Sequence, residues 1–331
     1  MTVTHVLRIN MTGLQENPAA EARRYQAALD MCEFVEEQGF SIINFEEHHC
    51  AANGWLPSPL IMAGMALART RKVNVSVTAL LVTLYDPVRL AEDIAVLDLA
   101  SNGRFSFVAG QGYRPEEYHA VNKHWEDRGK LTDEVIDTLL KAWSGKPFDY
   151  HGNTVRITPV PKSQPHPFFF LGGMSKAAAK RAARFGVPFY PPLAMPELEA
   201  LYYSELKKHG KKGFVYSPGA GNAMLFIDDN PEAAWQELGP YFLNESLEYA
   251  NWKQEGVPRP SEDAGSSIEA LKASGRYRIL TPQQCLQHFK ENPDTSAVVH
   301  PLAGGIPVER AWQMLKLYCS EVAAKLQKPD N

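Results

Sequence analysis

The feature that most constrains this chain is a regular alternation of short apolar runs with longer stretches of helical periodicity. Eight such pairs follow one another along the 331 residues. Parallel strands need a crossover connection, so this alternation predicts a parallel sheet covered by helices. The runs that we expect to form strands are 5–10, 40–45, 73–82, 104–110, 166–173, 187–193, 222–229 and 296–305.

Eight strand-helix units in a chain of this length predict a closed (β/α)8 TIM barrel with insertions, folded as a single domain over residues 1–331. A doubly wound open sheet is the alternative. That fold favours a GxGxxG turn after the first strand, and "RINMTGLQENP" has none. Residues 251–274 are polar and rich in Pro, Gly and Ser, and we predict a mobile lid there, with surface disorder as the alternative.

Composition limits the possible partners and the compartment. The net charge of −4 and pI of about 6.2 give the chain no general attraction for nucleic acid or an anionic membrane. The four cysteines include no CxxC pair, which is typical of a reducing compartment. No apolar run is long enough to cross a bilayer, and the N-terminus lacks the pattern of a signal peptide. We therefore expect a cytoplasmic protein.

The most reactive short stretch is "FEEHHC", residues 45–50, at the end of the second predicted strand. Barrel enzymes place their active sites at the carboxyl ends of the strands. His48 and His49 are neighbours, and neighbours on an extended chain point to opposite faces, so we expect no metal site. The structural alternative is that one histidine holds the strand end and the other packs in a loop.

Two glycine-rich stretches follow other predicted strands. Gly172, Gly173, Met174 and Ser175 precede a helix whose free N–H groups could bind a phosphate, although the glycines could equally make only a tight turn. The second stretch, "GQGY" at 110–113, allows close backbone approach to a flat ligand, and the alternative is a flexible loop.

Over almost its whole length the chain resembles the bacterial luciferase-like, flavin-dependent oxidoreductases. The resemblance lies in "FEEHH", "LYDPVRLAEDIAVLDLASNGRFSFVAGQGYRPEEY", "WSGKPFDYHG" and "FLGGMSKAAAKRAARFG". It implies a TIM-like barrel, usually dimeric, that binds reduced FMN, or F420 in a sister branch. In the monooxygenases, an NAD(P)H:flavin reductase supplies the FMNH2. Oxygen then adds at the flavin C4a carbon, and the peroxyflavin oxygenates a small substrate.

The resemblance also implies roles for particular residues. His48 would be the general acid/base or would bond the flavin-oxygen adduct, and Glu47 would orient it or hold the strand end. The end of the third strand, near Thr78 and Ala79, would lie against the flavin ring and carry a non-proline cis peptide. The remaining cofactor-binding positions implied by the resemblance are Gly110, Gln111 and Gly112 along the flavin, and Gly172, Gly173, Met174 and Ser175 at its phosphate.

The chain departs from the luciferase pattern at Gln111. Bacterial luciferases have an arginine at this position, which helps to neutralise the phosphate. Lys176, Arg181 or another basic group would have to compensate, or flavin binding would be weaker. We expect an FMNH2-dependent monooxygenase that uses O2 to oxygenate a small, somewhat apolar substrate. We also expect it to form a homodimer. The alternatives are an F420-dependent hydride-transfer enzyme, a flavin-binding protein without turnover and, last, a metal-dependent hydrolase.

Overall fold

The protein is a parallel α/β fold in a computed structural model that describes residues 3–14, 17–217, 223–252 and 267–326. Nine strands form one parallel sheet in the order β10-β9-β11-β1-β2-β3-β4-β7-β8. They are β1 (His5–Ile9), β2 (Ile42–Phe45), β3 (Asn74–Leu81), β4 (Phe105–Gly110), β7 (Phe169–Gly172), β8 (Phe189–Tyr190), β9 (Met224–Ile227), β10 (Tyr277–Leu280) and β11 (Ala297–Val299).

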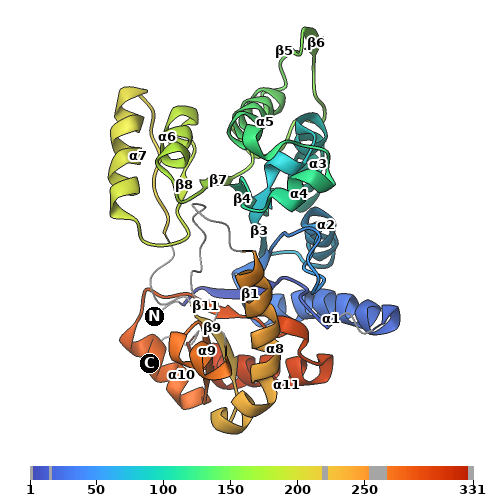
Figure 1. The fold of residues 1–331 in the computed structure, drawn as a ribbon, viewed down its shortest axis with the longest axis vertical. Coiled ribbons are helices and arrows are strands. Elements are labelled where there is room, and N and C mark those ends of the chain that lie inside the picture. The colour runs from blue at the N-terminus through green and yellow to red at the C-terminus, as the bar shows by residue number, and fades with distance from the viewer. Residues whose placement is uncertain (1–2, 15–16, 218–222, 253–266, 327–331) are drawn as a thin grey trace.

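Helices connect these strands and surround the sheet (Figure 1). The longer ones are α1 (Pro18–Glu37), α2 (Pro59–Arg69), α3 (Pro87–Ser101), α4 (Pro115–Ala120), α5 (Arg128–Trp143), α6 (Lys176–Phe185), α7 (Pro196–Lys208), α8 (Pro231–Asn251), α9 (Ile268–Ser274), α10 (Pro282–Glu291) and α11 (Val308–Tyr318). The short elements are η1 (Val82–Leu84), η2 (Trp125–Asp127), η3 (Ala303–Gly305), η4 (Cys319–Ala323) and α12 (Ala324–Leu326), with a hairpin of β5 (Phe148–Tyr150) and β6 (Asn153–Val155).

Two helices beside the strand ends begin in the same way, with a polar residue followed by proline, at Ser58-Pro59 and Asp86-Pro87. Helix α2 begins at Pro59 and α3 at Pro87, where the fixed φ of proline suits the first helical position. The Asp86 carboxylate accepts hydrogen bonds from the N–H groups of Val88 and Arg89, which have no partner inside the helix. These capping residues fix where the helices begin beside the strand ends.

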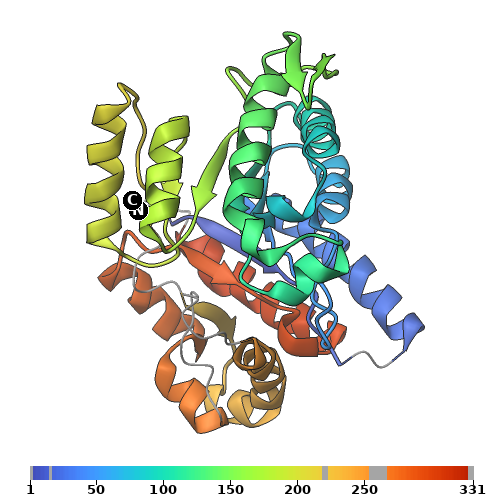
Figure 2. The same cartoon turned by 45° about the horizontal axis from the view of Figure 1, so that its top comes forward.

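The α/β class with a parallel sheet is confirmed, and two details differ from the prediction. The strand β10 and its helix α10 were not foreseen, and β9 lies between β10 and β11. The described strands end at β8 on one side and β10 on the other, and no described hydrogen bonds pair these two to close the ring. Figures 1 and 2 show α6 and α7 side by side next to β8, with α8 to α11 around the opposite end of the sheet.

The predicted lid at 251–274 falls largely outside the described residues, which omit 253–266. Its last part is regular, because Ile268–Ser274 form helix α9, capped by Ser267 at its start and by Gly275 at its end. The Ser267 hydroxyl accepts from Ala270 N, and Gly275 adopts a positive φ of 66°. This part of the prediction was therefore wrong, since a capped helix replaces the irregular segment.

Candidate active site

The carboxyl ends of four neighbouring strands gather the residues that the sequence singled out. Strands β2, β3, β4 and β7 pair in that order, so Glu47, His48 and the two glycine-rich stretches share one edge of the sheet. Close approach between the strand ends requires glycine. A Cβ on Gly110 would lie 2.7 Å from the Cβ of Ala79, and one on Gly172 would lie 2.8 Å from Cγ1 of Val108. The Thr78–Ala79 peptide is cis, as expected for this position.

His48 lies at the centre of this edge, directly after β2, and is 5% exposed. Its Nδ1 lies 2.8 Å from Oε1 of Glu117, and its Nε2 lies 3.1 Å from the hydroxyl of Tyr113. Both ring nitrogens are therefore engaged by side chains from the β4–α4 region. A histidine held at both nitrogens has one defined orientation, which suits acid/base chemistry.

Glu117 is the partner that sequence reasoning missed. It is fully buried in α4, and its Oε1 also accepts from the N–H of His49 at 3.0 Å and from Arg114 at 3.3 Å. Burial alone would raise the pKa of Glu117, but these bonds, led by that from His48, lower it below its usual value. The carboxylate is thus ionised and holds His48 electrostatically. The one local signal for Glu117 is Pro115, two residues before it, which predicts that a helix begins there.

Aromatic rings enclose His48 on its remaining sides. Four rings lie with their centroids 4.6–6.0 Å from that of the imidazole, namely Trp55, Tyr113, Tyr249 and Trp252. The Arg114 guanidinium packs on Trp252 with its carbon 4.0 Å from the ring centroid. Trp55 and Tyr113 thus reach the site, whereas Tyr190 packs at the end of β8 against Phe170 and Tyr216.

Glu47 does not orient His48, so that part of its expected role was wrong. Its Oε2 accepts from Leu81 N at 2.6 Å, while its Oε1 binds the Tyr85 hydroxyl at 2.6 Å and His49 Nε2 at 2.9 Å. The alternative role, holding a strand end, is the one observed, although the strand is β3. Burial lowers the pKa of His49, but the hydrogen bond and charge of Glu47 outweigh this, so the pKa is raised overall.

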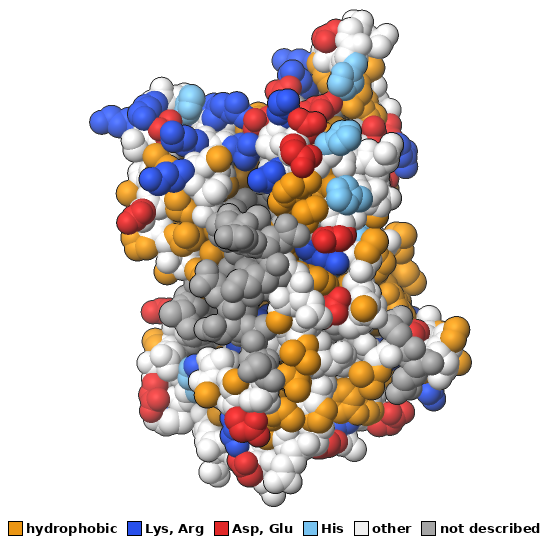
Figure 3. Space-filling view, in the orientation of Figure 1, with side chains coloured by type: hydrophobic (Ala, Val, Ile, Leu, Met, Phe, Trp, Pro, Cys, Tyr) orange, Lys and Arg blue, Asp and Glu red, His pale blue; other side chains and the backbone are white. Residues whose placement is uncertain are grey.

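The β7–α6 turn has the features of an anion site. Ser175 caps α6, and its hydroxyl accepts from Ala178 N at 3.2 Å, which leaves the N–H groups nearer the helix start for another partner. Gly173 has a φ of 151°, and Met174 beside it is partly exposed. Helix α6 contains four basic residues and no acidic ones. Figure 3 shows Lys and Arg side chains gathered over α6 and α7.

The structure distinguishes between the basic groups proposed to compensate for Gln111. Arg181 is engaged with Asp133 at 2.6 Å and with Gly129 O at 3.2 Å, so it is directed toward α5. Lys176 is exposed at the first position of α6, beside Ser175. The Gln111 amide lies 3.3 Å from the Thr132 hydroxyl. Lys176 is therefore the better placed of the two candidates, and Gln111 contributes no charge.

A second buried polar cluster, which no local sequence pattern predicts, surrounds Glu245 of α8. Its carboxylate lies within 2.9–3.6 Å of groups from Asn10, Thr12, Tyr277, His300 and Arg8. Burial alone would raise the pKa of Glu245, but the charges and hydrogen bonds of His300, Arg8 and Asn10 hold it well below its usual value. This cluster fixes α8, and with it Tyr249, against the ends of β1 and β11.

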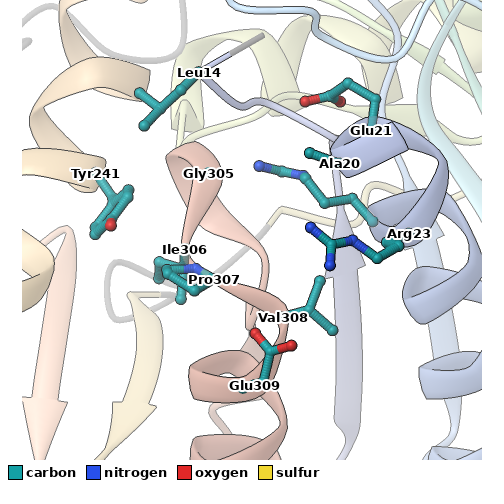
Figure 4. Close-up of a pocket in the computed structure, with 11 residues that line it drawn as sticks. Leu14, Ala20, Glu21, Arg23, Tyr241, Gly305, Ile306, Pro307, Val308 and Glu309 are labelled. Atoms are coloured by element: carbon teal, nitrogen blue, oxygen red, sulfur yellow. The ribbon is translucent and has the colours of Figure 1, made fainter. Parts of the chain in front are cut away.

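A cavity on the described part of the chain lies away from His48. It measures about 160 Å³, and its walls come from the start of α1, from α8 and from the segment before α11 (Figure 4). Its lining residues are Leu14, Ala20, Glu21, Arg23, Arg24, Tyr241, Gly305, Ile306, Pro307, Val308 and Glu309. The aromatic rings around His48 instead fill the space beside it.

The described residues lack the features of a metal site and of a membrane-spanning helix. They contain no cluster of three His, Cys, Asp or Glu side chains arranged to hold a metal ion. No described helix has both the length and the apolar character needed to cross a membrane.

Known proteins share this architecture. The chain is 24% identical over 266 residues to the alkanal monooxygenase beta chain of Vibrio harveyi, covering 76% of this chain and 81% of the relative. It spans about half the length of several other curated relatives, such as 49% of an uncharacterized protein of Sinorhizobium fredii.

Solved structures agree in fold at low sequence identity. Monooxygenase RslO1 of Streptomyces bottropensis matches with a TM-score of 0.75 and 19% identity, over 98% of this chain and 99% of that one. The oxygenating constituent of 3,6-diketocamphane monooxygenase from Pseudomonas putida, solved with FMN, matches over the whole of both chains. Its TM-score is 0.69 and its sequence identity is 15%. An F420-dependent secondary alcohol dehydrogenase with an F420-acetone adduct matches with a TM-score of 0.68 and 14% sequence identity, over 98% of this chain and 99% of that one.

The family model described as luciferase-like monooxygenase matches residues 5–294, which include every strand from β1 to β10 and the whole edge that carries His48. The match covers far more than half of the chain. The protein therefore belongs to the luciferase-like monooxygenase family.

Proposed function

We propose that the protein is a monooxygenase that uses reduced FMN and O2 to oxygenate a small organic substrate. The observation that carries this proposal is His48, held at both nitrogens and enclosed by aromatic rings at the carboxyl edge of the sheet. It lies on the same edge as a helix start suited to an anion. Family membership gives this arrangement its chemical class.

The residues present fit a flavin nucleotide. Gly173, Ser175 and Lys176 at the start of α6 would hold its phosphate, through N–H groups and one positive charge. Ala79, Gly110 and Gly112, at the ends of β3 and β4, would lie along its ring system. When bound, reduced flavin supplies the electrons that activate O2. A separate NAD(P)H:flavin reductase would supply it, since the chain has no GxGxxG turn of its own after β1.

The chain's own residues would then exclude water and hold a proton. Trp55, Tyr249 and Trp252 cover the imidazole and leave little room for solvent beside it. The ionised Glu117 accepts the hydrogen on Nδ1 of His48 and so keeps Nε2 directed toward Tyr113. Because the walls are mainly aromatic, a largely apolar substrate suits this enclosure better than a charged one.

Hydride transfer with F420 is the second candidate, and a specific observation favours it. Gln111 gives no charge to a flavin phosphate, and the fold is also that of an F420-dependent dehydrogenase. Against it, the imidazole lies in an aromatic enclosure, and the described site shows one well-placed cation, Lys176, for a long anionic tail.

Anaerobic titration of the protein with FMNH2 and with reduced F420, followed by mixing with oxygen, separates the two candidates. Tight FMNH2 binding and a long-lived absorbance band that forms only after oxygen would support the monooxygenase. Binding of F420 with no oxygen-dependent band would support hydride transfer. If neither cofactor binds, the proposed function is wrong.

We also propose a homodimer formed through α2 and α3. These helices expose four large apolar side chains, Ile61, Met65, Val96 and Leu99, with Ile61 65% exposed. A Cβ added to Gly64 of α2 would lie 3.3 Å from Cδ2 of Leu97 in α3. The two helices therefore pack together and present one joint surface. Sedimentation of Ile61→Lys should show a monomer where the unmodified protein shows a dimer. A protein that is monomeric before substitution would contradict this.

A further inference from the structure

The hydrogen bonds of His48 leave it no free nitrogen for a ligand. Nδ1 is occupied by Glu117 and Nε2 by the Tyr113 hydroxyl, and the imidazole side chain is 6% exposed. A ligand could reach Nε2 only by displacing Tyr113. Tyr113, by contrast, is half-buried, and it directly follows Gly112 at the carboxyl end of β4, on the edge where the flavin would lie.

The protonation states around His48 give these bonds a direction. An ionised carboxylate only accepts hydrogen bonds, so His48 must carry a hydrogen on Nδ1 to bond Glu117. In the neutral ring Nε2 is then an acceptor, and the Tyr113 hydroxyl donates to it. Burial raises the pKa of Tyr113 well above its usual value, so the hydroxyl keeps its proton at neutral pH.

Tyr249 completes the chain of groups on the other side. Its side chain is hydrogen-bonded to that of Tyr113. It is carried by α8, which the buried Glu245 cluster fixes in place. The Arg276 guanidinium lies 5.1 Å from its ring centroid, so a positive charge is near this end of the chain of hydrogen bonds. Tyr249 therefore orients the Tyr113 hydroxyl.

We propose that Tyr113, and not His48, is the catalytic residue that passes a proton to the reacting ligand, with His48 as the proton reservoir and Glu117 as the residue that positions it. This inference rests on the proposed function, because it concerns proton delivery during that reaction. It assigns a role to the tyrosine that the resemblance leaves unassigned.

The proton transfer balances without any further reactant. His48 first holds a proton on each nitrogen, as an imidazolium paired with Glu117. The Tyr113 hydroxyl gives its proton to an anionic oxygen of the reacting ligand and takes the Nε2 proton of His48 in its place. Tyr113 ends as a neutral hydroxyl, His48 ends neutral with its hydrogen on Nδ1, and one proton has moved to the ligand.

The test is Tyr113→Phe, which keeps the ring and removes only the hydroxyl. We expect kcat for substrate oxygenation to fall by roughly 10²-fold or more, as for a lost proton donor, with binding of reduced FMN unchanged. Tyr202→Phe is the matched control, because it also removes one hydroxyl from a buried tyrosine, bonded at 2.9 Å to Val187 O away from the site. It should keep full kcat.

A second measurement needs no turnover. In cofactor-free protein labelled with ¹⁵N-histidine, His48 should keep its Nδ1 proton throughout a pH titration, while Nε2 should carry a proton only when the ring is the imidazolium from which the proposed transfer starts. Tyr113→Phe should move only the Nε2 resonance toward that of a free nitrogen. A neutral ring with its proton on Nε2 and none on Nδ1 would overturn the proposal, because Nε2 could not then take up the further proton that Tyr113 passes on.

The kinetic outcomes are equally decisive. If Tyr113→Phe retains full kcat, or if Tyr249→Phe loses more kcat than Tyr113→Phe, Tyr113 is not the delivering group. Should the unmodified protein bind no reduced flavin, the proposed function fails, and the ¹⁵N spectra still decide whether the Tyr113–His48 bond has the required direction.

Discussion

Two buried histidines occupy opposite ends of the sheet and have opposite surroundings. His48, at the carboxyl end of β2, is joined to an ionised carboxylate and a tyrosine hydroxyl. His5, at the amino end of β1, is bonded to Tyr318 at 2.6 Å and packs against Phe40. Within the described residues, no group bonds its Nε2 and no carboxylate bonds its ring. Burial of similar depth therefore leads to different chemistry.

The difference shows what turns a core histidine into an acid/base group. Desolvation penalises a charged imidazolium in a buried site, but only His48 has a buried carboxylate bonded to its ring. At His5 burial acts unopposed and lowers the pKa to about 4. This matches the general division of barrel folds, in which the carboxyl face carries chemistry and the amino face carries stability.

The largest expected effect comes from removing the imidazole at the carboxyl end. His48→Ala should lower product formation by about 10²- to 10⁴-fold, as for a lost acid/base group, while binding of reduced FMN stays nearly intact. Single-turnover kinetics after mixing with oxygen would measure it. His5→Gln is the control at the other end and should keep its rate at neutral pH. Unchanged turnover in His48→Ala would remove His48 from the mechanism.

The next effect is on stability in acid and belongs to His5. An unfolded histidine titrates near 6.5 and the folded His5 near 4, so the unfolded state binds the proton more readily between these values. Stability is therefore lost as the pH falls from 6.5 toward 4, by about 3 kcal/mol in total from this group.

Urea unfolding of His5→Gln between pH 4 and 7 would test this. The slope of the unfolding free energy against pH should be shallower than in the unmodified protein, because the variant has no imidazole to protonate. The exposed His209→Gln should leave the slope as it is. An equal slope in His5→Gln would mean that another group causes the loss.

Local chemistry allowed much of this architecture to be predicted from the sequence. The helix starts at Pro59 and Pro87 and the helix end at Gly186 follow from caps and fixed backbone angles, and all three are observed. The position of His48 followed from strand-end logic. The location of the cis peptide at Thr78–Ala79 followed from the resemblance instead.

What could not be predicted depends on contacts between distant residues. Glu117 lies 69 residues from His48, and Glu245 lies 235 residues from Asn10, so no local pattern joins either pair. The strand β10, with the short sequence Tyr277–Leu280, lacks a run long enough to be distinguished from a loop. Of the two roles expected for Glu47, orienting His48 is not observed, because alternation along the chain does not show which neighbouring group a carboxylate will reach.

Glu117→Gln removes the charge that separates the two histidine sites while keeping the shape. All the described bonds of Glu117 use Oε1, which the glutamine oxygen can replace, and Oε2 has no described partner. A hydrogen bond to a charged group contributes about 1.5–3 kcal/mol, which corresponds to roughly 10- to 100-fold in rate.

We therefore expect kcat to fall by about that factor, less than in His48→Ala. Glu116→Gln, on the exposed side of the same helix, is the matched control and should have no effect. Retention of full kcat by Glu117→Gln would mean that position alone, without charge, separates His48 from His5.

The smallest expected effect concerns His49, the half-buried neighbour whose carboxylate partner is Glu47. The raised pKa of His49 means that this pair stabilises the fold below about pH 6.5, and that the contribution is lost as the pH rises through the folded pKa.

In Glu47→Gln the amide oxygen can accept from Leu81 N, and its NH2 can donate to Tyr85 or to neutral His49. The two largest effects that raise the pKa of His49, both from Glu47, are then lost, while burial and the Arg114 charge still lower it and only the Glu117 charge raises it, so the pKa should fall, as a histidine NMR titration would show. We expect turnover to drop by less than about tenfold, because Glu47 acts on His49 and β3 rather than on His48. A loss as large as that of Glu117→Gln would show that the two carboxylates act as one unit and that His48 has a second source of negative charge.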